Sequence, residues 1–328
     1  MMDLRWEGLH GIGRYASELA RRLPSVRALP VSGNPAAPLD PLRTARALHR
    51  HRPEVFFTPG FNPPLRSPVP FVFCIHDLIH VRVPEESSPA KTAYYRWIVR
   101  PAGLRAHRVI TDSEFSRRSI LAWSGWPDER VVVVPLAAST AFRPDGARHD
   151  AGGPYLLHVG NAKPHKNRRR LIEAFGASRL APALRLVLLG DSEPGEIALA
   201  RRLGVGESVV YAGVVPEPRL PDCYRGATAV VCPSLYEGFG LPALEAMACG
   251  TPVAAARATS LPEVAGDAAV YFDPLDVADI ARALVAVATD GALRAALVSR
   301  GARRAAAFSW DATARGVWTV LEEAARRC

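Results

Sequence analysis

Two glutamates on either side of a glycine-containing turn are the residues best suited to chemistry. Glu237 and Glu245 flank the sequence Gly-Phe-Gly-Leu-Pro, with seven residues between them. The apolar run 229–232 predicts a buried strand before the turn, and Pro242 suits the first turn of a following helix. Free amides at a helix N-terminus bind phosphate, and carboxylates accept hydrogen bonds from sugar hydroxyls. A nucleotide sugar carries both groups. The turn residues that would line this site are Gly238, Phe239, Gly240 and Leu241.

A second candidate site is marked by its lysines. The chain has 41 lysine and arginine residues but only three lysines, and Lys163 and Lys166 fall in one loop, NAKPHKN. The loop follows the strand-like run 155–159, and Asn167 suits the N-cap of the next helix. A lysine at a strand-to-helix junction suits phosphate, because its compact charge adds to that of the helix amides. The alternative is a solvated basic loop without a ligand.

These loops need strands and helices to position them, and the chain alternates between the two throughout. Short apolar runs separated by helical stretches are typical of βαβ units, which build parallel sheets. A polar, glycine-containing stretch at 143–154 interrupts the alternation and is the predicted linker. The sequence therefore predicts two doubly wound α/β domains that face a cleft. The expected strands are 54–57, 69–75, 108–111 and 131–134 in the first half, and 155–159, 184–189, 209–212, 229–232, 252–255 and 269–272 in the second.

The segment from Ser234 to Pro274 closely resembles the signature of the family 4 retaining glycosyltransferases, which have the GT-B fold. In that family two glutamates are separated by seven residues, as Glu237 and Glu245 are here. The continuation at 260–264 and 266–269 also resembles the family. The resemblance implies transfer of a hexose from a nucleotide diphosphate sugar to a hydroxyl, with the anomeric configuration retained. Glu237 would hold sugar hydroxyls near the reacting carbon, and Glu245 would hold the ribose.

The resemblance also implies roles for single residues. Lys166 would contact the donor diphosphate, and Lys163 or His165 would stand in for an arginine that the family often has upstream. His76, at the end of an apolar run, would lie beside the donor sugar, with Asp77 orienting its ring. The implied catalytic residues are therefore Glu237, His76 and Lys166. Further donor-site candidates are Gly11, Gly13, Asn161, Val214 and Val215, and the acceptor-side candidates are Arg14, Asp77 and Ser113, with Ser113 read first as a helix cap.

Domain boundaries follow from the linker and from the resemblance. We expect an acceptor-side domain at 1–148 and a nucleotide-sugar-binding domain at 149–309. The segment 310–328 would form a helix that returns to the first domain. The chain has 328 residues and an apolar fraction of 48 %, enough to build two cores.

Charge and hydropathy limit the partners. The net charge is +9 and the isoelectric point is near 9.7, but the arginines are dispersed and no zinc-finger spacing or basic tail occurs, so nucleic acid is not expected. No run of 18 apolar residues and no signal-peptide core is present, which predicts a soluble, cytoplasmic protein with reduced cysteines. The stretch 88–107 contains both aromatic and basic residues. We expect it to form a helical hairpin that is interrupted at Pro101. It would place the protein peripherally on an anionic membrane, unless its aromatics belong to the core.

The donor is the least specified part of the prediction. The loop GNAKPHKN resembles bacterial mannosyl- and hexosyltransferases that build surface polysaccharide or lipid-linked O-antigen. GDP-mannose is therefore the first expected donor and a glycan or lipid-linked hydroxyl the acceptor, with a UDP-sugar as the alternative. No cofactor or metal is expected, because no Asp-x-Asp and no ligand cluster occurs. A nucleotide-sugar epimerase and a non-catalytic nucleotide-sugar-binding scaffold remain as other classes.

Overall fold

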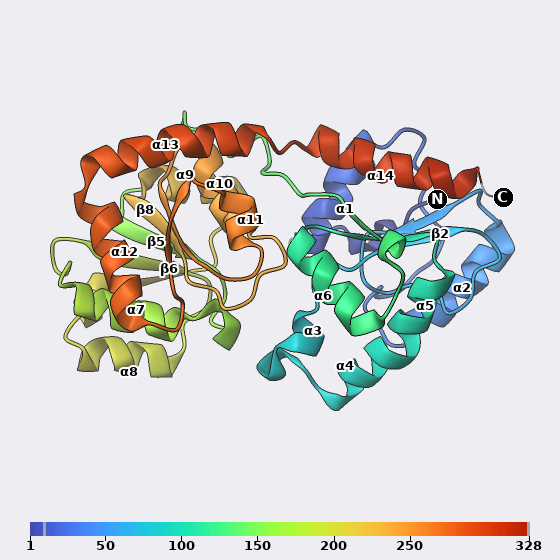
Figure 1. Ribbon diagram of the computed structural model, residues 1–328, viewed down its shortest axis with the longest axis horizontal. Helices are drawn as coiled ribbons and strands as arrows, with labels where there is room; N and C mark the ends of the chain where they lie inside the picture. Colours follow the sequence, from blue (N-terminus) through green and yellow to red (C-terminus); the bar gives the residue numbers. More distant parts are fainter. Residues whose placement is uncertain (9–10, 327–328) are drawn as a thin grey trace. The chain divides into compact units, whose positions relative to one another are not determined.

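The computed structural model describes residues 1–8 and 11–326 and divides the chain into two compact units. Unit 1 contains Met1–Leu136 and the C-terminal segment from Ser309, and unit 2 contains Ala137–Phe308 (Figure 1). Both units have a parallel sheet with helices around it, as the alternation of apolar and helical segments predicted.

Unit 1 is built on four parallel strands in the order β1-β2-β3-β4, at Phe56–Thr58, Phe71–Cys74, Arg108–Thr111 and Val131–Val133. The residues of β1 and β2 are fully buried, which explains why they read as apolar runs. Met2 forms isolated parallel bridges with Ala28 and Phe57. The helices are η1 (Leu4–Trp6), α1 (Gly11–Arg22), α2 (Asp40–His51), α3 (Ile79–Arg82), η2 (Pro84–Glu86), α4 (Pro89–Tyr94), η3 (Tyr95–Val99), α5 (Arg100–Arg105), α6 (Glu114–Ser124), η4 (Asp128–Arg130) and α14 (Trp310–Ala325).

The helical hairpin expected at 88–107 is wrong. The chain instead passes through α4, η3 and α5 without a turn, and η3 is a π-helix. The backbone N–H of Arg100 donates to the carbonyl of Tyr95, five residues earlier. Proline lacks a backbone N–H and crowds the preceding turn, so a wider π turn ahead of Pro101 lets the helix continue.

The C-terminal helix α14 packs on α1 and β2 of unit 1, as the family resemblance implied. Ser309 caps it by accepting a hydrogen bond from the Ala312 backbone N–H at 3.1 Å. The Thr313 hydroxyl donates to the Pro135 carbonyl at 2.7 Å, and Val317 is fully buried. The helix therefore completes the core of the unit in which the chain began.

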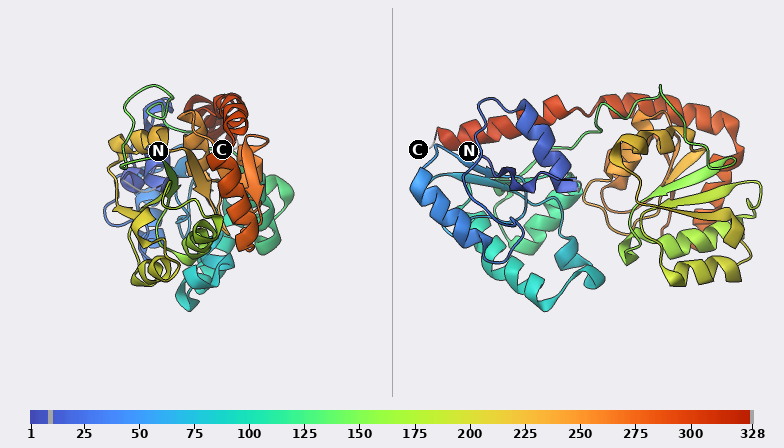
Figure 2. Two further views of the ribbon diagram at one scale, coloured as in Figure 1. Left: turned by 90° about the vertical axis from the view of Figure 1, so that its left-hand side faces the viewer. Right: turned by 180° about the vertical axis from the view of Figure 1, so that it is seen from behind.

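Unit 2 has six parallel strands in the order β10-β9-β8-β5-β6-β7. One helical layer contains α7, α8 and α12, and the other contains α9, α10, α11 and α13, on opposite faces of the sheet (Figures 1 and 2). The strands are β5 (Tyr155–Val159), β6 (Arg185–Leu189), β7 (Val209–Gly213), β8 (Ala229–Cys232), β9 (Val253–Ala256) and β10 (Ala269–Phe272). The helices are η5 (Pro164–Lys166), α7 (Arg168–Ser178), α8 (Pro194–Arg202), η6 (Gly206–Ser208), η7 (Glu217–Arg219), α9 (Leu220–Gly226), α10 (Leu241–Ala248), α11 (Leu261–Ala265), α12 (Val277–Thr289) and α13 (Gly291–Ala306).

The stretch 143–154 packs on unit 2, and the structure divides the units earlier, between Leu136 and Ala137, rather than between 148 and 149. Arg225 of α9 holds the stretch by donating to the Ala147 carbonyl at 2.7 Å, and the His149 N–H donates to the Asp222 carbonyl at 2.9 Å. Polar composition suggested a linker, but these hydrogen bonds give the stretch a fixed path along α9.

Candidate functional site

The sheet of unit 2 reverses its strand order between β5 and β8, and ligands of doubly wound sheets bind at the carboxyl ends of strands at such a point. Two of the predicted site loops leave the sheet there. The loop after β5 carries Lys166, and the loop after β8 carries Glu237. The Lys166 Nζ donates to Glu237 Oε1 at 2.7 Å, and each side chain is 16 % exposed. The structure thus joins two residues that the sequence placed in separate motifs.

Glu237 is held as a carboxylate. Burial by itself would raise its pKa, but the Lys166 ammonium and the hydroxyl of Ser234 favour the charged form, and the net effect is a lowered pKa. The Ser234 hydroxyl donates to Oε1 at 2.7 Å. Glu237 therefore stays ionised above its lowered pKa, and the carboxylate can accept hydrogen bonds from hydroxyl groups.

The turn after Glu237 has a fixed backbone. Gly240 has φ 103°, which favours glycine, and an added Cβ there would lie 2.7 Å from the Leu261 side chain. The buried Ser260 hydroxyl contacts two carbonyl oxygens of the turn, those of Glu237 at 2.9 Å and of Phe239 at 2.8 Å. Gly238 is buried, and the Phe239 ring packs on Phe308, so this turn offers a ligand its backbone more than its side chains.

Glu245 lies on the buried side of α10 and is only 3 % exposed. The hydroxyl of Tyr224 in α9 donates to its Oε2 at 2.8 Å. Burial and the neighbouring Glu245 carboxylate raise the pKa of Tyr224, which keeps the phenol protonated as a donor. The two signature glutamates therefore have different partners: Glu237 is paired with Lys166, and Glu245 with Tyr224.

Asn167 is the N-cap residue of α7, as predicted, but its side chain does not cap the helix. Its backbone is left-handed, with φ 59°, and its side chain makes no capping hydrogen bond. Its amide donates instead to the carbonyls of Pro233 at 3.1 Å and Pro274 at 2.7 Å. Asn167 thus ties the lysine loop to the loops after β8 and β10, a contact between segments that local sequence rules cannot reveal.

The other residues of the lysine loop differ in exposure. His165 is buried, and its carbonyl accepts the Leu235 N–H at 2.7 Å. Asn161 and Lys163 are exposed, and the Asn161 side chain accepts the Lys163 N–H at 3.4 Å. Beneath the loop, burial lowers the pKa of His158 to about 4, so this buried imidazole adds no charge beside Lys166 near neutral pH.

The two valines proposed to meet the base follow β7. Val214 is 79 % exposed, so it is not packed into the end of the strand. Val215 is partly buried and lines a cavity of about 210 Å³ together with Leu189 and Cys223. The other lining residues of this cavity include His149, Arg219 and Asp222, so the surface at this strand end combines apolar and charged groups.

In unit 1, His76 follows the end of β2 and its ring is oriented by Asp112. Nδ1 lies 2.8 Å from Asp112 Oδ2, and Nε2 lies 2.9 Å from the Pro59 carbonyl oxygen. Asp77 was expected in the orienting role, but its carboxylate accepts the Ile79 backbone N–H at 2.9 Å. Asp112 was missed because it is distant in sequence. It could have been found, since it follows β3, the neighbouring parallel strand.

The remaining candidates of unit 1 lie at helix starts. Ser113 caps α6 by accepting the Ser116 N–H at 3.1 Å and is fully buried, in accord with its first interpretation. Gly11 and Gly13 are in the first turn of α1, where a Cβ on Gly13 would collide with the Gly8 backbone. Arg14 is half-buried on the same helix.

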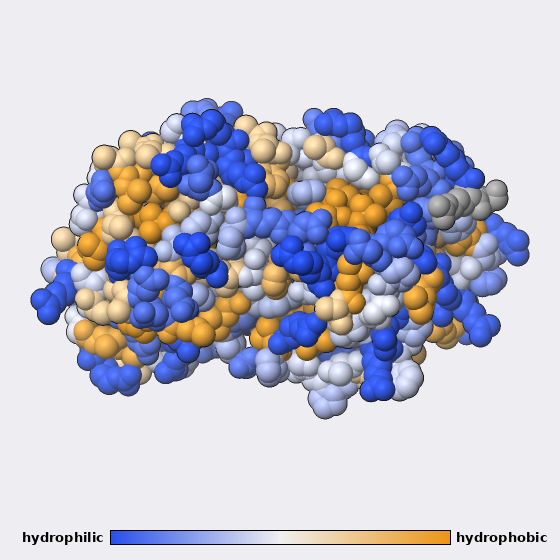
Figure 3. Space-filling model, in the orientation of Figure 1, coloured by the Kyte–Doolittle hydropathy of each residue, from blue (hydrophilic) through white to orange (hydrophobic). Residues whose placement is uncertain are grey.

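Residues 1–8 and 11–326 contain neither a cluster of metal-ligating side chains nor a membrane-spanning helix. No group of three metal-ligating His, Cys, Asp or Glu side chains occurs in those residues. No helix there is both long and apolar enough to cross a lipid bilayer. Hydrophilic side chains are spread between smaller apolar areas on the face shown in Figure 3.

Family comparisons define the class of the chain. Residues 142–304 match the family described as "Glycosyl transferases group 1", and residues 9–142 match "Glycosyltransferase Family 4". The O-antigen chain mannosyltransferase B of Escherichia coli is 32 % identical over 90 % of this chain and 81 % of its own length. A D-inositol 3-phosphate glycosyltransferase of Acidothermus cellulolyticus is 35 % identical over 67 % of this chain, a match that spans about half (54 %) of that protein. The chain belongs to glycosyltransferase family 4.

Solved structures agree on the fold. Sucrose-phosphate synthase of Thermosynechococcus elongatus has a TM-score of 0.77 at 18 % identity, covering 100 % of this chain and 98 % of its own. Anabaena HepE, solved with UDP and glucose, has a TM-score of 0.68 at 20 % identity, covering 84 % and 79 % of the two chains. The predicted α/β GT-B fold class is confirmed.

Proposed function

We propose that this protein is a retaining hexosyltransferase that moves mannose from GDP-mannose to a hydroxyl of a glycan or lipid-linked acceptor. The observation that carries the proposal is the Lys166–Glu237 pair at the carboxyl ends of β5 and β8. It supplies a cation for a diphosphate and a carboxylate for sugar hydroxyls at one place. Family membership supports a transferase over an epimerase or a scaffold.

The proposed reaction requires stabilisation of the negative charge on the leaving diphosphate. When the glycosidic bond breaks, negative charge grows on the diphosphate, and the Lys166 ammonium and the amides at the start of α10 would stabilise it. Glu237 would hold hydroxyls of the sugar, and Glu245 the ribose. Because Oε1 of Glu237 already accepts from Lys166 and Ser234, we favour a same-face substitution, in which a diphosphate oxygen takes the acceptor proton, over attack by Glu237. This route needs no metal.

The choice of donor rests on similarity. The mannosyltransferase from Escherichia coli supports mannose and a role in O-antigen or related polysaccharide synthesis. Anabaena HepE was solved with UDP and glucose, which makes a UDP-sugar the alternative. We further propose that the base meets the backbone and apolar surface at Val214 and Val215.

The donor proposal predicts selective stabilisation by one nucleotide. We expect GDP and GDP-mannose to raise the melting temperature more than UDP, ADP, dTDP and their sugars, with Mg²⁺ or with EDTA. A ligand at 100 times its Kd adds about 2.7 kcal/mol to the free energy of unfolding, which is measurable by thermal shift. A larger increase in melting temperature with UDP-sugars would identify a UDP-sugar as the donor instead of GDP-mannose. No increase with any nucleotide would contradict the proposed donor site.

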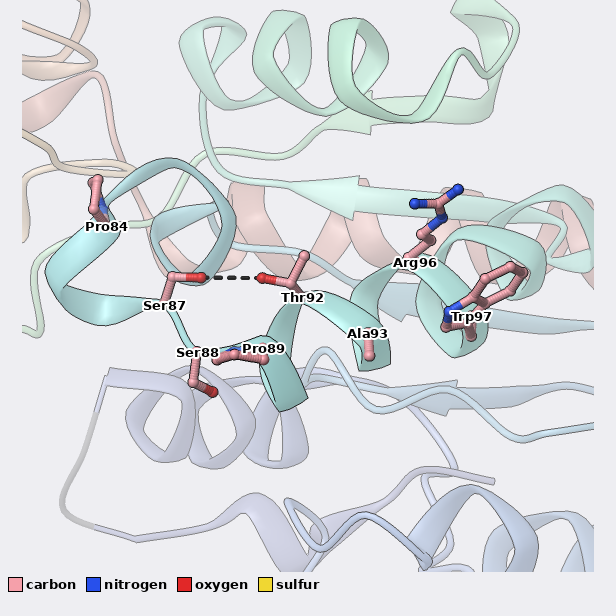
Figure 4. A pocket seen from close by; sticks show the side chains of 8 residues that line it. All are labelled: Pro84, Ser87, Ser88, Pro89, Thr92, Ala93, Arg96 and Trp97. Atoms are coloured by element: carbon pink, nitrogen blue, oxygen red, sulfur yellow. Dashed lines mark hydrogen bonds between the residues drawn. The ribbon is translucent and has the colours of Figure 1, made fainter.

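We also infer a peripheral contact between an anionic membrane and the helix formed by α4, η3 and α5. Trp97 is 66 % exposed and Leu104 is 56 % exposed. The Arg96 guanidinium lies 5.1 Å from the centre of the Trp97 ring. Both side chains border a surface pocket of about 650 Å³ (Figure 4), whose other lining residues are Pro84, Ser87, Ser88, Pro89, Thr92 and Ala93. Exposed aromatic and basic side chains are typical of interfacial helices.

Replacing Arg96 by glutamine should weaken binding to vesicles that contain phosphatidylglycerol by about fivefold, since one basic residue at a membrane surface contributes about 1 kcal/mol. The measurement is co-sedimentation at low and high salt. Arg282→Gln, the same charge change at an exposed arginine of unit 2, is the matched control and should bind as the wild type does. Equal binding of wild type and Arg96→Gln would contradict the contact.

A further inference from the structure

The surroundings of His76 are unusual because both ring nitrogens face an oxygen that can only accept. Nδ1 lies 2.8 Å from a carboxylate oxygen of Asp112, and Nε2 lies 2.9 Å from the backbone carbonyl of Pro59. A neutral imidazole has one N–H and would leave its other nitrogen lone pair against an oxygen lone pair. Only the doubly protonated ring satisfies both contacts.

Burial strengthens this requirement. The Asp112 side chain is 4 % exposed and that of His76 is 17 % exposed. A neutral His76 would leave the Asp112 carboxylate without a counter-charge in a place that water barely reaches, and unpaired buried charges are strongly destabilising. The carboxylate and the imidazolium therefore stabilise each other.

The groups described around His76 include Tyr15, Cys74 and one more carboxylate, that of Asp77. The Tyr15 ring from α1 packs edge-on against the imidazole, with ring centres 5.1 Å apart, and the Cys74 thiol of β2 lies 3.5 Å from the Tyr15 hydroxyl. Burial raises the pKa of both Tyr15 and Cys74, so both stay neutral. Asp77, the next residue along the chain, adds a weaker attraction for the imidazolium.

We propose that Asp112 is a positioning residue that holds His76 as an imidazolium, so that His76 contributes a fixed positive charge and cannot act as a general base. The inference rests on the proposed function, because the family resemblance implies that His76 lies beside the donor sugar. A cation suits a reaction in which negative charge develops on the leaving diphosphate. Because an imidazolium cannot accept a further proton, the proton of the attacking hydroxyl must go to another group, which agrees with its transfer to a diphosphate oxygen of the donor.

The stability that the His76–Asp112 pair contributes should depend on pH. Burial alone would lower the pKa of His76, but Asp112 and the Pro59 carbonyl outweigh it and raise the pKa to about 9. The ordinary value is near 6.5. The pair should therefore stabilise the folded protein fully below about pH 6.5 and lose this contribution as the pH rises through about 9.

The direct test is an NMR titration of the histidine side chains in the donor-free protein, with His76 assigned by its absence in His76→Gln. We expect His76 to titrate well above the ordinary range. In Asp112→Asn, which keeps the shape but removes the charge, its pKa should fall by about one to three pH units. Asp112→Glu should restore most of the shift. Asp128→Asn, an exposed carboxylate of the same unit, is the control and should leave His76 unchanged.

Transferase rates measured against pH provide the second readout. The alkaline limit of kcat should move down in Asp112→Asn by the same amount as the pKa of His76, at pH values where circular dichroism shows both proteins folded. A wild-type His76 that titrates near 6.5, or one that Asp112→Asn leaves unchanged, would overturn the inference. A shifted pKa with an unshifted rate profile would overturn the positioning role. Absence of transfer by the wild type would count against the proposed function alone, since the titration needs no donor.

Discussion

Replacing Lys166 by alanine is expected to lower kcat/KM by about 100- to 1,000-fold, the usual cost of removing one preorganised donor to a developing negative charge. Its ammonium is held at the carboxyl ends of β5 and β8 through a 2.7 Å contact with Glu237. Because the diphosphate carries more charge in the transition state than in the ground state, the loss should appear in kcat and not only in KM. Steady-state kinetics with the donor identified by thermal shift provide the measurement.

Two comparisons sharpen the Lys166 experiment. Lys163→Ala removes the same charge from an exposed position of the same loop and should cost much less. Arg202→Ala, at the exposed end of α8, should leave the rate unchanged. Equal losses for Lys166 and Lys163 would indicate that the loop acts through its net charge, and a rate unaffected by Lys166→Ala would contradict its assigned role.

Replacing Glu237 by glutamine should lower kcat/KM by about 10- to 100-fold, which is the range for one hydrogen bond to a charged group. Glutamine keeps the size of the side chain, and the Ser234 hydroxyl can still donate to it, so the fold should be retained. The amide would release Lys166 from its ion pair. We therefore expect the affinity for the free nucleoside diphosphate to be maintained or increased while transfer falls, measured by calorimetry and by initial rates.

An unchanged or increased nucleotide affinity together with slower transfer would distinguish Glu237 from a residue with a purely structural role. Glu245→Gln provides the contrast, because Glu245 is buried and accepts from Tyr224. Its replacement should reduce stability as well as nucleotide affinity. Parallel losses of nucleoside diphosphate affinity and transfer in Glu237→Gln would contradict the assignment of this residue to the sugar.

The inner strands of the sheets could be predicted from the sequence because they are short apolar runs that are buried in the structure, as β2, β8 and β9 are. The edge strands β4, β7 and β10 are only partly buried. Runs such as 155–159 and 229–232 match β5 and β8 at both ends. The lysine loop and the glutamate turn could be placed because both follow such strands directly. The order of the strands in the sheet, however, could not be predicted from these runs. The contact between Lys166 and Glu237 depends on that order, because it forms only where β8 lies beside β5.

Residues that act between segments were harder to predict. Asn167 was read by a local rule as a helix cap, yet its amide joins two distant carbonyls. Asp77 was assigned to His76 because it is adjacent in sequence, whereas Asp112 is adjacent across the sheet. Pro101 was read as a break, but one π turn absorbs it. In each case a tertiary contact or a local change of helix type outweighed the propensity of the residue.

The most direct test of the proposed function is the anomeric configuration of the sugar first released from GDP-mannose. With no acceptor present, slow hydrolysis of the donor can be followed by proton NMR before the free sugar mutarotates. GDP-mannose carries an α linkage, so the account predicts that α-mannose appears first and that Lys166→Ala suppresses its formation. Initial release of β-mannose would contradict retention and the same-face substitution built on Lys166 and Glu237.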